Sequence, residues 1–239
     1  MSSRAVGLGV AALLLAVPAV AQEVTIPTRS PRTGAVIFRG GGYKPRIDTE
    51  KALNGATPYK DTFGDASLLL IELELQRFFY QGIGTAGLGL GVGYGEKYAD
   101  AKLDDGSAAA DKAALKVLPI QLNGFYKFDY AAFRWGIPLV PYAKLGLVYS
   151  PWWMTKGSET EVVEGSKASG GKWGWAGTAG VSFLLDVLEP RFARDFDSDL
   201  GVNHSYLFAE YTHADVNNFG GKGLVLSSRR WMFGLALDY

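Results

Sequence analysis

The chain has 239 residues, with 24 basic and 24 acidic side chains, so its formal net charge is zero. It shows no basic excess of the kind that attracts nucleic acid, and without cysteine it has neither a disulfide framework nor a thiolate zinc site. Only 20% of the residues are charged, while 31 are glycine and 13% are aromatic. The length allows one large domain or two small ones. The order of the residues, more than their proportions, indicates the fold class.

Residues 1–21 have the pattern of a secretory signal peptide. Arg4 supplies a positive start, residues 5–17 form an uncharged apolar run, and Ala19 and Ala21 fit the small-residue cleavage site. The run is short and is followed by Pro18, which disfavours an N-terminal membrane helix. We therefore expect cleavage before Gln22 and export from the cytoplasm.

The rest of the chain alternates apolar with small or polar residues. In residues 71–77, Ile71, Leu73 and Leu75 fall on one face of a strand and the intervening acidic and amide side chains on the other. No stretch approaches the ~20 apolar residues of a spanning helix. The same period of two recurs, so that the sequence predicts eight strands, whose alternating residues lie at 35–44, 71–77, 86–94, 118–126, 143–149, 175–183, 207–212 and 231–239.

Strand length and loop length indicate a membrane barrel. Strands of about 10 residues or more exceed the 5–6 typical of globular sheets and match a tilted membrane-spanning strand. Long polar loops and shorter links alternate, as in outer-membrane barrels with long external loops and short periplasmic turns. Long loops are expected at 45–66, 96–114, 150–172 and 214–226, and links at 80–84, 129–137 and, longer, 187–202.

The sequence therefore predicts an all-β fold, an eight-stranded antiparallel transmembrane β-barrel over residues 35–239, in the cell outer membrane. Residues 22–34 are expected to form a periplasmic N-terminal segment. Aromatic residues are expected in two bands at the lipid–water interfaces. The external band comprises Tyr43, Tyr94, Tyr149, Trp152, Trp153, Trp173 and Trp175, and the periplasmic band comprises Phe78, Phe79, Tyr80, Tyr126, Phe128, Phe183, Tyr206 and Tyr239.

The C-terminal residues Gly234, Leu237 and Tyr239 look like the signal read by the barrel assembly machinery, although Met232 stands where a polar residue is usual. With the segments 188–194 (LEPRFAR) and 199–204 (DLGVNH), the chain after residue 21 resembles the small outer-membrane β-barrel proteins described in myxobacteria. The resemblance implies fold and location and no reaction. The expected partners are the assembly machinery, outer-membrane lipid and lipopolysaccharide, with no nucleic acid.

An eight-stranded barrel is filled by its own side chains. Alternation assigns polar residues to the lumen: Glu72, Glu74, Gln76, Gln121, Asn123, Lys144, Thr178, Ser182, Glu210, Thr212 and Arg230. Buried charges must be paired, so we expect an ion-pair network of Glu72, Glu74, Lys144, Glu210 and Arg230 that plugs the barrel. The alternative is a narrow gated pathway in which Arg230 or Lys144 switches between acidic partners.

Two local motifs need interpretation. Residues 82–87 fit the G-x-G-x-x-G dinucleotide pattern, but the period of two continues after them, so we expect a tight hairpin and not a nucleotide site. The alanine-rich stretch 107–115 suggests a short helical turn, and Pro190 and Gly201 suggest a short helix in the 187–202 link.

No complete catalytic constellation is present. His204 and His213 are the only histidines, and His213 with Asp215 is the one weak candidate pair at the outer rim. Clustered loop acids could hold a divalent cation, although such residues usually keep loops solvated: Asp104, Asp105, Glu159, Glu161, Glu164, Asp215, Asn217 and Asn218. We expect no cofactor, no metal, and a structural or loop-mediated binding or adhesion role. The alternatives are a rim-sited enzyme acting on lipid or peptide, and a narrow channel.

Overall fold

The computed structural model describes residues 31–102, 108–156, 159–160, 162–163, 166–221 and 223–239. The expected signal peptide, with Ala19 and Ala21, and most of the expected segment 22–34 lie outside these residues. The strands of the main sheet are β1 (Gly34–Tyr43), β2 (Leu68–Gly82), β3 (Gly84–Lys102), β4 (Ala108–Val117), β5 (Ile120–Lys127), β6 (Leu139–Lys156), β7 (Glu159–Thr160), β10 (Ser169–Leu184), β11 (His204–Val216) and β12 (Ser228–Asp238).

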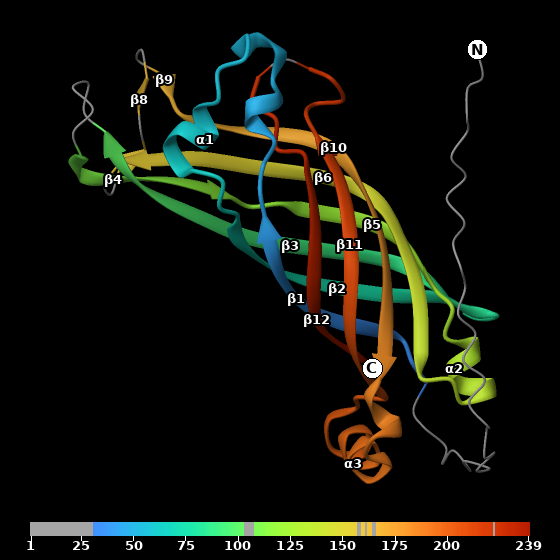
Figure 1. The fold of residues 1–239 in the computed structure, drawn as a ribbon. Helices are drawn as coiled ribbons and strands as arrows, with labels where there is room; N and C mark the ends of the chain where they lie inside the picture. The colour runs from blue at the N-terminus through green and yellow to red at the C-terminus, as the bar shows by residue number, and fades with distance from the viewer. Residues whose placement is uncertain (1–30, 103–107, 157–158, 161, 164–165, 222) are drawn as a thin grey trace, which may run out of the picture.

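The sheet is antiparallel and closes on itself (Figure 1). β1 pairs with β2 on one side and with β12 on the other, and β6 pairs with β10. β4 and β5 are successive halves of one strand interrupted at Pro119, because both pair with β3 and with β6 in one continuous register. The short β7 pairs only with β6. Eight strand positions therefore surround the barrel, which confirms the predicted fold.

The end that holds Gly34 and Asp238, here called the terminal end, has compact connections. A single residue, Ile83, separates β2 from β3, and Gly84 takes φ +101° in this turn. The dinucleotide-like motif thus continues into a strand, as expected. The other two links contain helices (Figure 1). The link between β5 and β6 contains α2 (Tyr130–Trp135), and the link between β10 and β11 contains η3 (Leu185–Val187) and α3 (Pro190–Leu200). The helix predicted in the 187–202 link is therefore confirmed.

The opposite end, here called the loop end, is taller than expected. Strand pairing continues through most of the predicted loops at 96–114 and 150–172, because β3, β4, β6 and β10 extend beyond their apolar stretches. The helical turn expected at 107–115 is wrong, since residues 108–117 form β4. Pairing of β4 with β3 and β6 outweighs the helix preference of alanine. The remaining elements here are η1 (Ile47–Thr49), η2 (Lys51–Leu53), α1 (Pro58–Phe63) and a separate hairpin of β8 (Val162–Val163) and β9 (Ser166–Lys167).

The outside of the barrel is apolar. Alternate residues along β2 are exposed and buried, so that Leu73 and Leu75 face out while Glu72 and Glu74 face in. Exposed large apolar residues of the other strands include Phe38, Leu88, Leu90, Leu122, Leu145, Leu147, Val181, Leu207, Phe233 and Leu235. No helix in the described part of the chain has the length and apolar character needed to span a membrane.

Three aromatic residues expected in the interface bands face inward. Tyr43, Phe78 and Tyr206 are buried, because each lies on the inward parity of its strand. The Tyr43 hydroxyl donates a hydrogen bond to the carbonyl oxygen of Leu226 at 2.7 Å. Trp152 is half-buried against the interior. Others of the expected aromatic residues are exposed: Phe79, Tyr80, Tyr94, Tyr126, Trp173, Trp175 and Tyr239.

The interior is layered along the barrel axis. An apolar cluster at the loop end includes Leu70, Leu115, Val148, Leu226 and Met232, with Tyr59 and Phe63 of α1 covering it. A second apolar cluster at the terminal end includes Ile37, Phe125, Val140, Phe208 and Ala236. Arg39, Glu72 and Glu74 lie between these two clusters, whereas Arg230 also contacts Tyr43 of the loop-end cluster.

Candidate functional site

Glycines of β3 create the room for the polar layer. Gly89, Gly91 and Gly93 face inward, and the acidic side chains of the neighbouring β2 extend across them. A Cβ at Gly89 would lie 2.7 Å from Oε1 of Glu74, and one at Gly93 would lie 2.8 Å from Cγ of Glu72. Side chains at these positions would therefore displace the two carboxylates.

Arg39 of β1 is the centre of the polar layer. Its Nε donates to Oε2 of Glu72 and its Nη1 donates to Oε2 of Glu74, both at 2.6 Å. Its Nε also lies 3.3 Å from Oε1 of Glu210. All four side chains are almost fully buried. One guanidinium therefore binds three carboxylates from β2 and β11.

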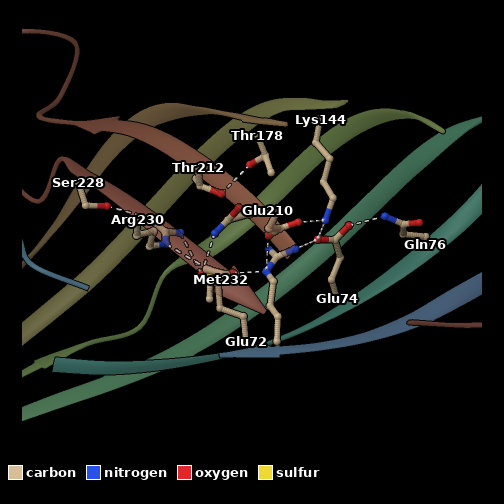
Figure 2. A network of polar contacts seen from close by, with 12 residues as sticks. Glu72, Glu74, Gln76, Lys144, Thr178, Glu210, Thr212, Ser228, Arg230 and Met232 are labelled. Carbon is tan, nitrogen blue, oxygen red and sulfur yellow. Dashed lines mark hydrogen bonds and ion pairs between the residues drawn. The ribbon is translucent and has the colours of Figure 1, made fainter. Parts of the chain in front are cut away.

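Two further cations complete the layer (Figure 2). Nζ of Lys144 donates to Glu74 at 3.1 Å and lies 3.3 Å from Oε2 of Glu210. Nη2 of Arg230 donates to Oε1 of Glu72 at 3.2 Å. Together with Arg39 these residues form the central network, defined as Arg39, Glu72, Glu74, Lys144, Glu210 and Arg230. Its three acids are balanced by three bases, which is the arrangement that makes buried ionised groups tolerable.

Neutral groups donate one further hydrogen bond to each of the three acids. Gln76 donates to Glu74 at 2.7 Å, Gln121 donates to Glu72 at 3.0 Å, and the Tyr142 hydroxyl donates to Glu210 at 2.8 Å. Two small internal cavities, of about 20 and 10 Å³, flank the central network. The larger has room for about one water molecule. The polar layer is therefore densely packed between the apolar clusters.

The structure brings together all five residues expected in the lumen ion-pair network, and adds Arg39. Sequence reasoning missed Arg39 because both faces of β1 carry small or apolar residues, so that the sequence alone does not show which face of this strand points into the lumen. The signal was available in the pairing of strands: Arg39 lies opposite Glu72 on the neighbouring strand, so the two side chains share a face.

A second polar cluster closes the terminal end. Nη1 of Arg32 donates to Asp129 at 3.0 Å and to Asp238 at 3.3 Å, and its guanidinium lies 4.5 Å from the ring centroid of Phe133 in α2. Lys127 donates to Asp238 at 3.2 Å. Both carboxylates are buried. This cluster connects the segment before β1 to the end of β12, so that it spans the strand pair that closes the barrel.

The two histidines lie in different surroundings. Nδ1 of His204 is 2.7 Å from Oδ2 of Asp186 at the terminal end. His213 lies at the loop end and accepts a hydrogen bond from Nε of Arg229 at 3.2 Å, while Asp215 accepts one from the Ser227 hydroxyl at 2.7 Å. His213 and Asp215 share the outward face of β11, and each bonds a different residue. A rim-sited enzyme that uses this pair stays the untested alternative.

The expected assembly signal has a close-packed glycine. A Cβ at Gly234 would clash with the carbonyl oxygen of Phe38 and lie 2.8 Å from the ring of Phe208. Leu237 and Tyr239 lie on the outward parity of β12. Reading of these residues by an assembly machinery stays a prediction.

The loop residues considered for a cation are described only in part. Asp104, Asp105, Glu161 and Glu164 lie outside the described residues. Oδ1 of Asn217 accepts from the amide of Gly220, and Oδ1 of Asn218 from the amide of Trp173, each at 2.8 Å. Among the side chains that the structure describes, no three acidic or histidine groups come close enough together to hold a metal ion.

No family model and no curated protein matches this chain. Solved structures with a similar arrangement of strands include Ail, the attachment invasion locus protein of Yersinia pestis, in complex with the heparin analogue sucrose octasulfate. Ail shares 11% sequence identity with this chain at a TM-score of 0.45, and the match covers 87% of this chain and 97% of Ail. Neisserial surface protein A has 12% identity and a TM-score of 0.46 over 86% and 97%. The outer membrane protein OprG from Pseudomonas aeruginosa has 16% identity and a TM-score of 0.47 over 87% and 97%. Similarities of this degree assign no ligand or reaction to the chain.

Proposed function

We propose that this chain is an outer-membrane barrel that conducts no solute and acts as a structural protein or as a binding protein through its loop end. The single observation that carries the proposal is the layered interior. A conducting lumen needs a continuous polar path, whereas here an apolar cluster lies on each side of the central network. Arg39, which bonds three carboxylates, fixes the network in place.

The outward face supports the membrane location. On β12 the outward residues Trp231, Phe233, Leu235, Leu237 and Tyr239 form one uncharged row. Nine residues of strand extend ~30 Å, which at a tilt of ~40° covers about 23 Å along the membrane normal. The apolar band of outer-membrane barrels is ~25 Å tall. In water the same row would be a large exposed apolar patch, which monomeric soluble proteins rarely carry.

The loop end supports a binding role. With both termini in the periplasm, the loop end faces outward from the cell. β3 ends at Lys102, four residues beyond Tyr98, its last exposed aromatic residue. Four residues of strand reach roughly 10 Å above that residue at the same tilt. Together with β4, β6 and β10 they form a hydrogen-bonded wall, with α1 against β3, which offers a surface to a partner.

Two measurements on the full chain test the proposal. Cell fractionation should recover the protein with outer membranes, and the refolded protein should give a heat-modifiable, β-rich species in detergent. Single-channel recording should give near-zero conductance for the protein and for Arg230→Ala, because both apolar clusters persist in the variant. Stable steps of ion conductance, or recovery as a freely soluble periplasmic protein, would contradict the proposal. Conductance that appears only in Arg230→Ala would favour the gated-channel alternative.

A further inference from the structure

We propose that the outward face where β1 meets β12, at the loop end, binds the phosphate groups of an outer-leaflet lipid through Arg46 and Arg229. This inference rests on the proposed outer-membrane location. It assigns a ligand class to a surface outside the central network. We define the basic rim as Lys44, Arg46, His213 and Arg229.

The strand register brings Lys44, Arg46 and Arg229 together. Each residue of β1 pairs with a residue of β12 from Ala35 opposite Asp238 to Gly41 opposite Met232. The same register continues to Arg46, whose amide donates to the carbonyl oxygen of Ser227 at 3.0 Å. Lys44 therefore lies opposite Arg229, and the alternation of both strands directs Lys44, Arg46 and Arg229 to the outside.

Only part of the positive charge of the rim is already neutralised. Lys44 donates to Asp65 at 3.1 Å, and this hydrogen bond, with the nearby charge of Lys60, lowers the pKa of the Asp65 carboxyl. The guanidinium groups of Arg46 and Arg229 are exposed. Among the residues described by the structure, neither guanidinium forms an ion pair.

The other titratable groups beside Arg229 are His213 and Asp215. His213 uses Nδ1 to accept from Nε of Arg229, and among the described residues Nη1 and Nη2 of Arg229 form no hydrogen bond. Asp215 is held by the hydroxyl of Ser227 at 2.7 Å. A planar guanidinium with its terminal N–H groups available is well suited to bind phosphate oxygens.

The depth of the rim matches a lipid headgroup. Arg229 is ten residues before Tyr239 on the same outward row of β12. That length of tilted strand crosses a band of about 25 Å, which places Arg229 at the outer interface when Tyr239 lies at the inner one. Exposed cations at this depth face the phosphate layer of the lipid.

The surface below the rim suits an acyl chain. The exposed Trp231 and Phe233 of β12 lie on one side and the exposed Leu69 and Ile71 of β2 on the other. Between them, the outward positions of β1 are Gly40 and Gly42. A Cβ at Gly40 would find only one atom within 4 Å, at 3.7 Å. The strip between the apolar walls therefore has no side chain. Free phosphate would bind the cations alone, whereas a phosphorylated lipid also covers this strip.

Native mass spectrometry of the full refolded chain in a neutral detergent tests the inference. The probes are bisphosphorylated lipid A and a phosphate-free form with the same acyl chains. The double variant Arg46→Gln/Arg229→Gln removes both exposed guanidinium groups. The matched control, Arg191→Gln/Arg194→Gln, removes two exposed arginines from α3 at the other end of the molecule.

We expect the bisphosphorylated lipid to bind at least about tenfold more tightly than the phosphate-free form, and the rim variant to lose that preference while the α3 variant keeps it. Equal binding of the two lipids, or an unchanged preference in the rim variant, would overturn the inference. Complete displacement of the lipid by millimolar inorganic phosphate would show a phosphate site and not a lipid site, and would also overturn it. If the protein forms a heat-modifiable barrel in outer membranes but shows no lipid preference, only this inference fails and the proposed function stands.

Discussion

Replacing Arg39 by methionine tests whether the central network holds the barrel together. The guanidinium makes two 2.6 Å charged hydrogen bonds and a third contact at 3.3 Å, with 3% of its side chain exposed. Methionine would leave three buried carboxylates with two cations. Breaking a buried ion pair by removing one partner costs about 3–5 kcal/mol. We expect the free energy of unfolding to fall by that amount in Arg39→Met.

A double variant separates charge balance from loss of packing. In Arg39→Met/Glu74→Gln the two remaining acids, Glu72 and Glu210, face the two remaining cations, Lys144 and Arg230. We therefore expect the double variant to be about 2 kcal/mol more stable than Arg39→Met alone, because no uncompensated charge remains. This comparison stays informative if the single variant does not fold.

Urea unfolding in lipid vesicles, followed by tryptophan fluorescence and by the heat-modifiable gel shift, gives these free energies. Arg191→Met in α3, where the arginine is exposed, is the matched control and should change stability by less than about 0.5 kcal/mol. Our account of the network would be refuted if the free energy of unfolding of Arg39→Met were within about 1 kcal/mol of that of the unmodified protein. Such a difference is well below the cost of breaking a buried ion pair. Strict additivity of the two substitutions would also refute it.

Three further substitutions test separate parts of the molecule by urea midpoint, gel shift or proteolysis. Gly89→Ala should destabilise the barrel by about 1–3 kcal/mol, because the new Cβ would lie 2.7 Å from Glu74. In the control Gly91→Ala the atom nearest to the new Cβ lies 3.6 Å away, so stability should change by less than about 1 kcal/mol. Equal urea midpoints for the two variants would contradict this. Arg32→Gln should lower the free energy of unfolding by about 3 kcal/mol and lower the gel-shift temperature, because the buried Asp129 and Asp238 lose a shared cation. A gel-shift temperature equal to that of the control Arg77→Gln, which changes an exposed arginine, would show that Arg32 does not stabilise the closure of the barrel. Asp48→Ala should cost about 1 kcal/mol and speed proteolysis within α1, because Asp48 accepts from the amides of Tyr59 and Lys60 at 2.8 and 3.1 Å; cleavage as slow as in Lys51→Ala would refute it.

The sequence predicts the barrel well because both faces of most strands are chemically distinct. In β2, Glu72, Glu74 and Gln76 alternate with leucines, and the observed burial follows that alternation. The predicted eight strands and the predicted helix between β10 and β11 are confirmed. Periodicity identifies these elements because membrane-facing and lumen-facing residues must differ at every second position.

The sequence predicts strand ends poorly because pairing continues after the alternation stops. Residues 96–102 and 108–114 carry lysine, aspartate and alanine without a two-faced pattern, yet they pair with each other. The aromatic bands show a different error. Phe78 lies two residues after the inward Gln76, so the alternation of β2 directs it to the interior. Its position near the end of the strand led instead to its placement in the aromatic band at the lipid–water interface. In the structure it is buried.

The pairing of Ala35 with Asp238 has a consequence for how the chain folds. These partners are about two hundred residues apart, so the closing contact has a very high contact order, and proteins dominated by such contacts fold slowly. A chain truncated before β12 would retain two unpaired edges, at β1 and β11, which the complete chain covers. A chain that lacks the eleven-residue strand β12 therefore cannot close its sheet, and the pairing of β12 with β1 is the contact that completes the cylinder.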